Sequence, residues 1–163
     1  MKQGNSYAHR VLSSAIRVRR ARESDLPAID TLYRQLKPGE YEQYAPHPAK
    51  MRSGFRKIAR SRDHHLLVAE AEGRVVGTIH VLIFRHLGHG VRPGAIVENV
   101  IVAETARSRG VGEKLLGAAR AIALREGCYK IALTSRMHRT GAHRFYQRLG
   151  WKHSHHGYSI YLK

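Results

Sequence analysis

Apolar positions recur along the chain with two periods, which predict alternating strands and helices. Strands are expected where every second residue, or nearly every residue, is apolar: 15–19, 65–70, 75–84, 96–102, 130–134, 151–154 and 158–162. Helices are expected where apolar residues recur every three to four positions: 24–36, 49–60, 111–126 and 142–150. The pattern predicts one α/β domain over residues 15–163 after a flexible tail of residues 1–14.

Local signals set the boundaries of these elements. Ser24-Asp-Leu-Pro27 predicts a helix start, because a capping side chain precedes a proline whose missing N–H costs nothing in the first turn. Pro38-Gly39 ends that helix, and residues 40–48 are expected to form a loop. Glu72-Gly73 predicts a tight hairpin turn between two strands.

The segment after the strand Ile96–Val102 indicates a phosphate-binding loop. Arg107-Ser-Arg-Gly-Val-Gly112 leads directly into an amphipathic helix. Gly110 and Gly112 lack Cβ, so their backbone can approach a ligand closely, and the first helical turn has unpaired N–H groups. Arg107 and Arg109 add positive charge, so the loop suits a polyanionic ligand.

The spacing of this loop excludes two common nucleotide motifs. A Walker loop needs Lys-Ser/Thr after its second glycine, but here Glu113-Lys114 follows Gly112. A dinucleotide fingerprint would place its third glycine at Leu115, and the next strand lacks an acidic residue for a ribose hydroxyl. Taken alone, the six residues are also compatible with an ordinary glycine-containing turn that carries surface arginines.

Two motifs together resemble those of the GCN5-related N-acetyltransferase (GNAT) family. Arg107-x-x-Gly110-x-Gly112 is similar to the family's pyrophosphate loop, and Ala142-x-x-x-Tyr146-x-x-x-Gly150-Trp151 is similar to its second signature. The resemblance covers roughly residues 15–163. It implies a GNAT-like, mixed but mostly antiparallel central sheet flanked by helices. It also implies an N-acetyltransferase whose cofactor is acetyl-coenzyme A (acetyl-CoA).

The resemblance implies a set of cofactor-binding residues. The strand ending at Val102 is expected to pair with the pantetheine arm, and one of its N–H groups to stabilise the oxyanion. The family often has Asn three residues before the signature alanine, where this chain has Arg139. The expected cofactor-binding residues are Val100, Ile101, Val102, Arg107, Ser108, Arg109, Gly110, Val111, Gly112, Arg139 and Tyr146.

Glu98 and Tyr146 are the candidate catalytic residues. An alkylammonium acceptor, with a pKa of about 10, must lose a proton before it attacks a thioester. Glu98 is the only acid in an apolar strand, and alternation should place it on one face with Val100 and Val102, where desolvation would raise its pKa. In the family, a glutamate here often acts as base through water, and a tyrosine matching Tyr146 protonates the thiolate. The alternatives are an edge carboxylate paired with arginine, and a tyrosine that only packs in the core.

Basic residues in two loops suggest that the acceptor carries an anionic group. The expected substrate-binding residues are Arg85, His86 and His89, with Arg92 close by, and Arg136 and His138. Stretches 35–41, 142–146 and 154–155, with the histidine-bearing loop, resemble the aminoalkylphosphonate N-acetyltransferase branch. That resemblance implies a small primary amine bearing phosphonate, and a sugar-phosphate amine would also fit.

Composition adds limits on partners and location. With 29 Lys+Arg against 12 Asp+Glu, the formal net charge is +17, which favours anionic partners and nonspecific nucleic-acid contact. Compositional drift toward arginine is the plain alternative. Two other functions stay open: an enzyme that acetylates protein N-termini or lysines, and a non-catalytic module that binds RNA or ribosomes.

Few metal, redox or membrane signals appear. Cys128 is the only cysteine, which excludes an intrachain disulfide, and a buried side chain is expected. His86-x-x-His89 is at most half of a metal site, so no metal is predicted. No apolar run is long enough for a membrane span, and the basic first 22 residues lack an apolar signal core. We therefore expect a cytoplasmic protein, with a homodimer as one alternative suggested by the resemblance.

Overall fold

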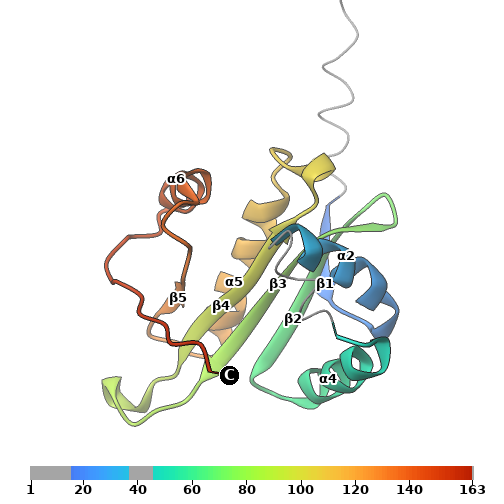
Figure 1. The fold of residues 1–163 in the computed structure, drawn as a ribbon. Coiled ribbons are helices and arrows are strands. Elements are labelled where there is room, and N and C mark those ends of the chain that lie inside the picture. The colour runs from blue at the N-terminus through green and yellow to red at the C-terminus, as the bar shows by residue number, and fades with distance from the viewer. Residues whose placement is uncertain (1–15, 37–45, 163) are drawn as a thin grey trace, which may run out of the picture. The chain divides into compact units, whose positions relative to one another are not determined.

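The computed structural model describes residues 16–36 and 46–162, and Figure 1 shows their fold. The chain divides into two compact units, residues 1–132 and residues 133–163. The strands are β1 (Arg17–Arg20), β2 (His64–Ala71), β3 (Arg74–Phe84), β4 (Gly94–Val102) and β5 (Ile131–Leu133). The helices are α2 (Leu26–Leu36), α4 (Pro48–Arg60), α5 (Val111–Arg125) and α6 (Thr140–Arg148). Short 3-10 turns lie at Glu23–Asp25, His89–Val91 and Glu104–Ala106.

A five-stranded sheet in the order β1-β2-β3-β4-β5 organises the first unit, and β5 crosses into the second. The pairs β1–β2, β2–β3 and β3–β4 are antiparallel. The segment entering β5 runs parallel to the start of β4, because Tyr129 N donates to Pro93 O (2.9 Å) and Ala95 N donates to Lys130 O (3.0 Å). The predicted mixed, mostly antiparallel sheet is confirmed.

Helices cover both faces of this sheet (Figure 1). On one face, Leu66 and Val68 of β2 form a core cluster with Leu26 and Ile29 of α2, and side chains of α4 pack against it. Gly77 of β3 lies on the other face, under α5. A Cβ on Gly77 would lie 3.1 Å from both Val111 Cγ1 and Leu115 Cδ1.

The structure confirms two element boundaries that local sequence signals predicted. The hairpin turn is confirmed, with Glu72 and Gly73 at φ of 52° and 72°, the left-handed pair that a two-residue turn requires. The helix start is also confirmed, but Asp25 makes the capping bond instead of Ser24, because Asp25 Oδ2 accepts from Arg22 N at 2.7 Å. The predicted tail 1–14 and most of the loop 40–48 lie outside the described residues.

The expected strands at residues 151–154 and 158–162 are wrong, because the structure has no strand in either segment. The apolar side chains of the second segment are exposed: Tyr158, Ile160, Tyr161 and Leu162. An apolar pattern makes a strand only where a neighbouring strand supplies hydrogen bonds and a buried face, and short segments carry no information about that neighbour.

Within the described residues, no helix is both long enough and apolar enough to cross a membrane. Cys128 is buried, as expected, and burial raises the pKa of its thiol.

Candidate active site

The loop between β4 and α5 has the geometry of an anion-binding helix start. Gly110 adopts a φ of 79° at the N-cap of α5, a conformation that favours glycine. Lys114 N bonds to Gly110 O at 3.0 Å, so the N–H groups of Val111 and Gly112 precede the first intrahelical donor. Ser108 also has a positive φ, of 61°. The loop therefore presents main-chain donors at the positive end of a 15-residue helix.

The surroundings of this loop fit a pyrophosphate group. A Cβ built on Gly110 meets no atom within 4 Å, so the space before the helix is open. Arg107, Ser108 and Arg109 are all exposed, and among the described residues the Arg107 guanidinium has one ion pair, to exposed Glu104 at 3.4 Å. Both arginines can therefore turn toward an anion at little cost, because surface ion pairs contribute little.

A β-bulge interrupts β4 next to Glu98. Glu98 pairs with His80 and Ile101 with Thr78, so Asn99 and Val100 together face the single residue between them on β3. Asn99 has a φ of 52°, a conformation that asparagine tolerates better than most residues. The expected alternation is wrong beyond this point, because Val102 pairs with Gly77, on the face opposite to Glu98.

Tyr33 of α2 contacts the bulge of β4 at Asn99. Its hydroxyl hydrogen-bonds to the Asn99 side chain, and burial raises the pKa of this tyrosine. The sequence analysis missed both residues. Asn99 was detectable as a polar residue in an apolar strand, whereas Tyr33 looked like one more apolar position of its helix.

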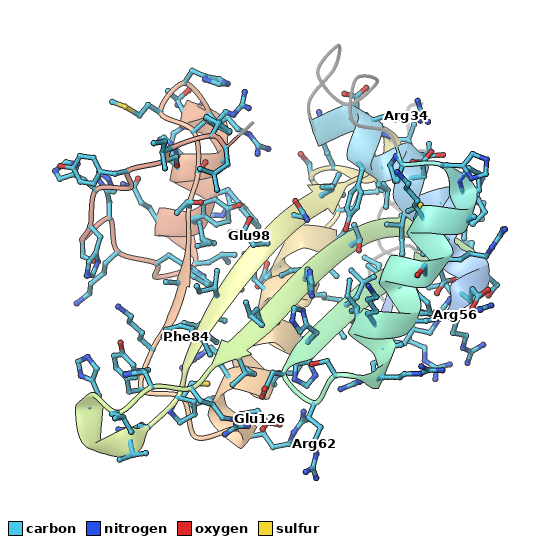
Figure 2. All side chains as sticks on the ribbon, turned by 60° about the horizontal axis from the view of Figure 1, so that its bottom comes forward. Arg34, Arg56, Arg62, Phe84, Glu98 and Glu126 are labelled. Atoms are coloured by element: carbon cyan, nitrogen blue, oxygen red, sulfur yellow. The ribbon has the colours of Figure 1, made fainter. Side chains whose placement is uncertain are left out.

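Glu98 itself is exposed on β4, as Figure 2 shows. The burial expected of its carboxylate is therefore not found. Its cross-strand partner is His80. Directly opposite residues on antiparallel strands share a face, with Cβ atoms about 5 Å apart, so an imidazole is placed next to the carboxylate.

His80 and His64 form a histidine pair that the sequence analysis also missed. His64 Nδ1 and His80 Nε2 lie 3.0 Å apart, so one nitrogen carries the hydrogen and the other accepts it. Burial, with smaller contributions from His64 and His65, lowers the pKa of His80 to about 4, so this ring is neutral at physiological pH. His80 is an ionisable residue among the apolar residues of its strand, the same signal that singled out Glu98.

The predicted substrate-binding residues in the loop after β3 differ from one another in their contacts. Arg85 is ion-paired with Asp63 (3.1 Å). His86 stacks on Phe84, and its ring lies edge-on to that of His89 at 5.6 Å between centroids. His89 in turn stacks on Tyr129, with the ring centroids 3.9 Å apart.

The same loop contains Arg92 and the two histidines that were considered as metal ligands. Arg92 donates to the main-chain oxygens of Gly127 and Cys128, both at 3.4 Å. Within residues 16–36 and 46–162, no group of three or more His, Cys, Asp or Glu side chains could hold a metal ion. The two histidines of the loop, His86 and His89, therefore lack a third ligand in the described structure.

The second unit carries the other predicted catalytic residue. Tyr146 lies on α6, and burial raises the pKa of its hydroxyl, against a smaller opposing effect of the Arg139 charge. The phenol is therefore protonated at neutral pH and able to donate. Arg139 is the N-cap of α6, and Arg136 O lies 3.0 Å from His143 Nε2. Arg136 and His138 are exposed.

Because β5 is much shorter than β4, part of β4 has only β3 as a neighbouring strand among the described residues. β4 has nine residues and β5 has three. A strand of three residues pairs with only part of one of nine, so the edge of β4 around Val100–Val102 keeps main-chain groups that β5 is too short to bond. Such an edge can accept an extended ligand as an added strand.

Comparison with known proteins identifies relatives of this chain. Residues 26–151 match the sequence profile of the acetyltransferase (GNAT) family. An aminoalkylphosphonate N-acetyltransferase of Salmonella typhimurium is 31% identical over 138 residues, which are 85% of this chain and 86% of that protein. Glucosamine 6-phosphate N-acetyltransferase 1 of Oryza sativa subsp. japonica is 32% identical over 120 residues, 69% of this chain and 71% of that protein.

The fold has matches among solved structures as well. A transcriptional regulator from Bacillus halodurans superposes with a TM-score of 0.82 at 28% sequence identity. The match covers 90% of this chain and 99% of the other.

Proposed function

Because this chain belongs to the acetyltransferase (GNAT) family and is an N-acetyltransferase that uses acetyl-CoA, we propose that its acceptor is a small primary amine carrying an anionic group. One observation carries the proposal. The two curated relatives are named for acceptors that combine an amine with a phosphonate or a phosphate. Both match most of this chain, at 31% and 32% identity.

The loop Arg107–Gly112 would hold the pyrophosphate of the cofactor. The main-chain donors at the start of α5 and the guanidinium groups of Arg107 and Arg109 supply the contacts. The edge of β4 at Val100–Val102 would bind the pantetheine arm. The cofactor, when bound, supplies an acetyl group activated as a thioester.

Glu98 would remove the proton of the attacking ammonium group, directly or through one water. Its carboxylate is exposed beside the β4 bulge, where an incoming amine can reach it. In the tautomer whose Nε2 accepts from His64 Nδ1, the neutral imidazole of His80 can donate from Nδ1 to the carboxylate or to such a water. The bond between Tyr33 and Asn99 holds the bulge that turns this part of β4.

Tyr146 would return a proton to the leaving thiolate. This role needs a protonated hydroxyl at neutral pH, and burial raises the pKa of Tyr146 in that direction. The neighbouring Arg139 would contact the cofactor in place of the asparagine that the family often has.

Basic side chains of the two loops would bind the anionic group of the acceptor. His86, His89 and His138 supply donors, and none of these three is ion-paired to a carboxylate among the residues that the structure describes. The Arg136 guanidinium supplies further donors. Arg85 would take part by exchanging its partner Asp63 for the acceptor.

The proposal is tested by thiol release from acetyl-CoA with matched amine pairs. The pairs are 2-aminoethylphosphonate against propylamine, and glucosamine 6-phosphate against glucosamine. We expect kcat/KM to be higher for the anionic member of both pairs. If the cofactor binds but no small amine is acetylated, the proposed acceptor class is wrong, and peptide N-termini and lysines become the acceptors to test.

A further inference from the structure

A second basic region lies at the opposite end of α5 from the cofactor loop. It is a hollow of about 760 Å³. We call it the basic hollow, and its charged lining residues are Arg20, Arg60, Arg62, Arg85, Arg125, Asp63 and Glu126, with His65 beside them. Figure 2 labels Arg62 and Glu126 at this end of the molecule, far along the sheet from Glu98. Five arginines against two acids give the lining a formal surplus of three positive charges.

One ring nitrogen of a buried histidine in the lining has no hydrogen-bond partner among the described residues. His65 is 2% exposed, and its Nδ1 lies 2.7 Å from Arg20 Nη2. A guanidinium can only donate, so Nδ1 accepts and the ring hydrogen of the neutral imidazole sits on Nε2. In the part of the chain that the structure describes, this buried Nε2 has no partner. A buried donor without an acceptor is costly, so the site favours a ligand with acceptor oxygens.

The arginines of the hollow are only partly neutralised. Arg85 pairs with Asp63 at 3.1 Å, and Arg125 pairs with Glu126 at 3.5 Å. Arg60 and Arg62 have no ion pair within 4.0 Å among the described residues. Both α4 and α5 end here, so Arg60 and Arg125 partly offset the negative ends of these helices. Arg62 follows α4 and has no such counterpart.

We propose that the basic hollow binds a polyphosphate group, as in inorganic pyrophosphate or a nucleotide, at a site about 22 Å from the cofactor loop, the length of α5. Phosphate oxygens match what the lining offers. They accept from several guanidinium groups at once, and they can accept from the orphaned imidazole N–H. Arg85 lines the hollow and also has a role in the proposed acceptor site, but the groups that carry this inference, Arg20, Arg60, Arg62 and His65, have no role there.

The test is an NMR titration of the full-length chain with inorganic pyrophosphate at physiological ionic strength. Main-chain amide shifts separate binding at Arg60–Asp63 from binding at Gly110–Gly112, and the ring N–H of His65 reports the histidine directly. The test variant is Arg60→Gln with Arg62→Gln. The control is Arg52→Gln with Arg74→Gln, which removes the same charge from exposed positions outside the hollow.

We expect saturable shifts at Arg60–Asp63 and His65. Pyrophosphate affinity at these residues should fall at least about tenfold in the test variant, because both substitutions remove a charged hydrogen-bond donor. In the control variant it should fall less than about twofold. Parallel titrations with ATP and with a short RNA identify the source of the phosphate. Equal losses in the two variants, no saturation, or RNA binding that spreads over the whole basic surface would each overturn the proposal.

Discussion

At the scale of residues, two carboxylates differ in their surroundings. Asp25 is 6% exposed and accepts from both terminal nitrogens of Arg19, at 2.7 and 3.0 Å, and from Arg22 N at 2.7 Å. Arg19 also bonds to Glu70 at 2.7 Å, which ties the turn before α2 to β1 and β2. Glu98 is exposed beside a bulge. A saturated carboxylate holds structure, whereas an accessible one can exchange protons.

Asp25→Asn should lower the free energy of unfolding by about 2 kcal/mol at neutral pH, because it removes a charged acceptor from Arg19. The hydrogen bond from Arg19, chiefly, holds the pKa of Asp25 below its ordinary value. This stabilisation is therefore complete above the unfolded pKa of about 3.9 and is lost as the pH falls through the lower folded pKa. Urea unfolding should show the difference between the two proteins shrinking below pH about 4. A constant difference would contradict the assignment.

Glu98→Gln should lower kcat by about a hundredfold, since a positioned base contributes that much to proton removal. KM for acetyl-CoA should change little, because the cofactor loop is on a different segment. Stopped-flow or steady-state thiol release across the pH range measures both. A variant with full activity would remove Glu98 from the mechanism.

At the scale of elements, the contact of α5 with the sheet depends on one glycine. A Cβ on Gly77 would lie 3.0 Å from Ile101 O and 3.1 Å from the α5 side chains beneath it. Gly117 lies on the exposed side of α5, with nothing within 4 Å of a built Cβ. The two glycines therefore offer a matched pair of substitutions.

Gly77→Ala should destabilise the protein by about 1–3 kcal/mol through overpacking. Gly117→Ala should stabilise it by up to about 1 kcal/mol, because alanine favours a helix interior. Chemical denaturation of both variants provides the measurement. Equal effects of the same sign would show that α5 does not pack on Gly77 as described.

The sequence was informative wherever structure depends on neighbours along the chain. The hairpin turn, the helices and the strand–loop–helix around Gly110 follow from local periodicity and turn residues. Prediction from the sequence failed where the structure depends on residues that are distant along the chain. The bulge at Asn99 is visible only in the register with β3, and the predicted strands 151–154 and 158–162 needed a neighbour that the sequence does not reveal.

The same division applies to the candidate site. Arg107, Gly110 and Gly112 were detectable because one short motif contains them. The residues around the β4 bulge come from three other segments: His80 of β3 pairs with Glu98, His64 of β2 contacts His80, and Tyr33 of α2 bonds to Asn99. No spacing in the sequence connects these residues, so only the fold brings them together.

At the scale of the whole molecule, the net charge and the names of two relatives support the same proposal for the acceptor. A formal net charge of +17 attracts anions generally, and this attraction alone would not discriminate among them. Selection of an anionic amine requires donors placed in the acceptor site. Discrimination that persists at high salt would therefore separate a built site from general attraction.

The most direct measurement is a competition between 2-aminoethylphosphonate and propylamine at equal concentrations, with acetyl-CoA limiting and both N-acetylated products quantified by mass spectrometry. The product ratio equals the ratio of kcat/KM values. We predict at least about a hundredfold preference for the phosphonate, because a site built for charged hydrogen bonds rejects an analogue that leaves them unpaired. A ratio near one, or a preference for propylamine, would contradict the account.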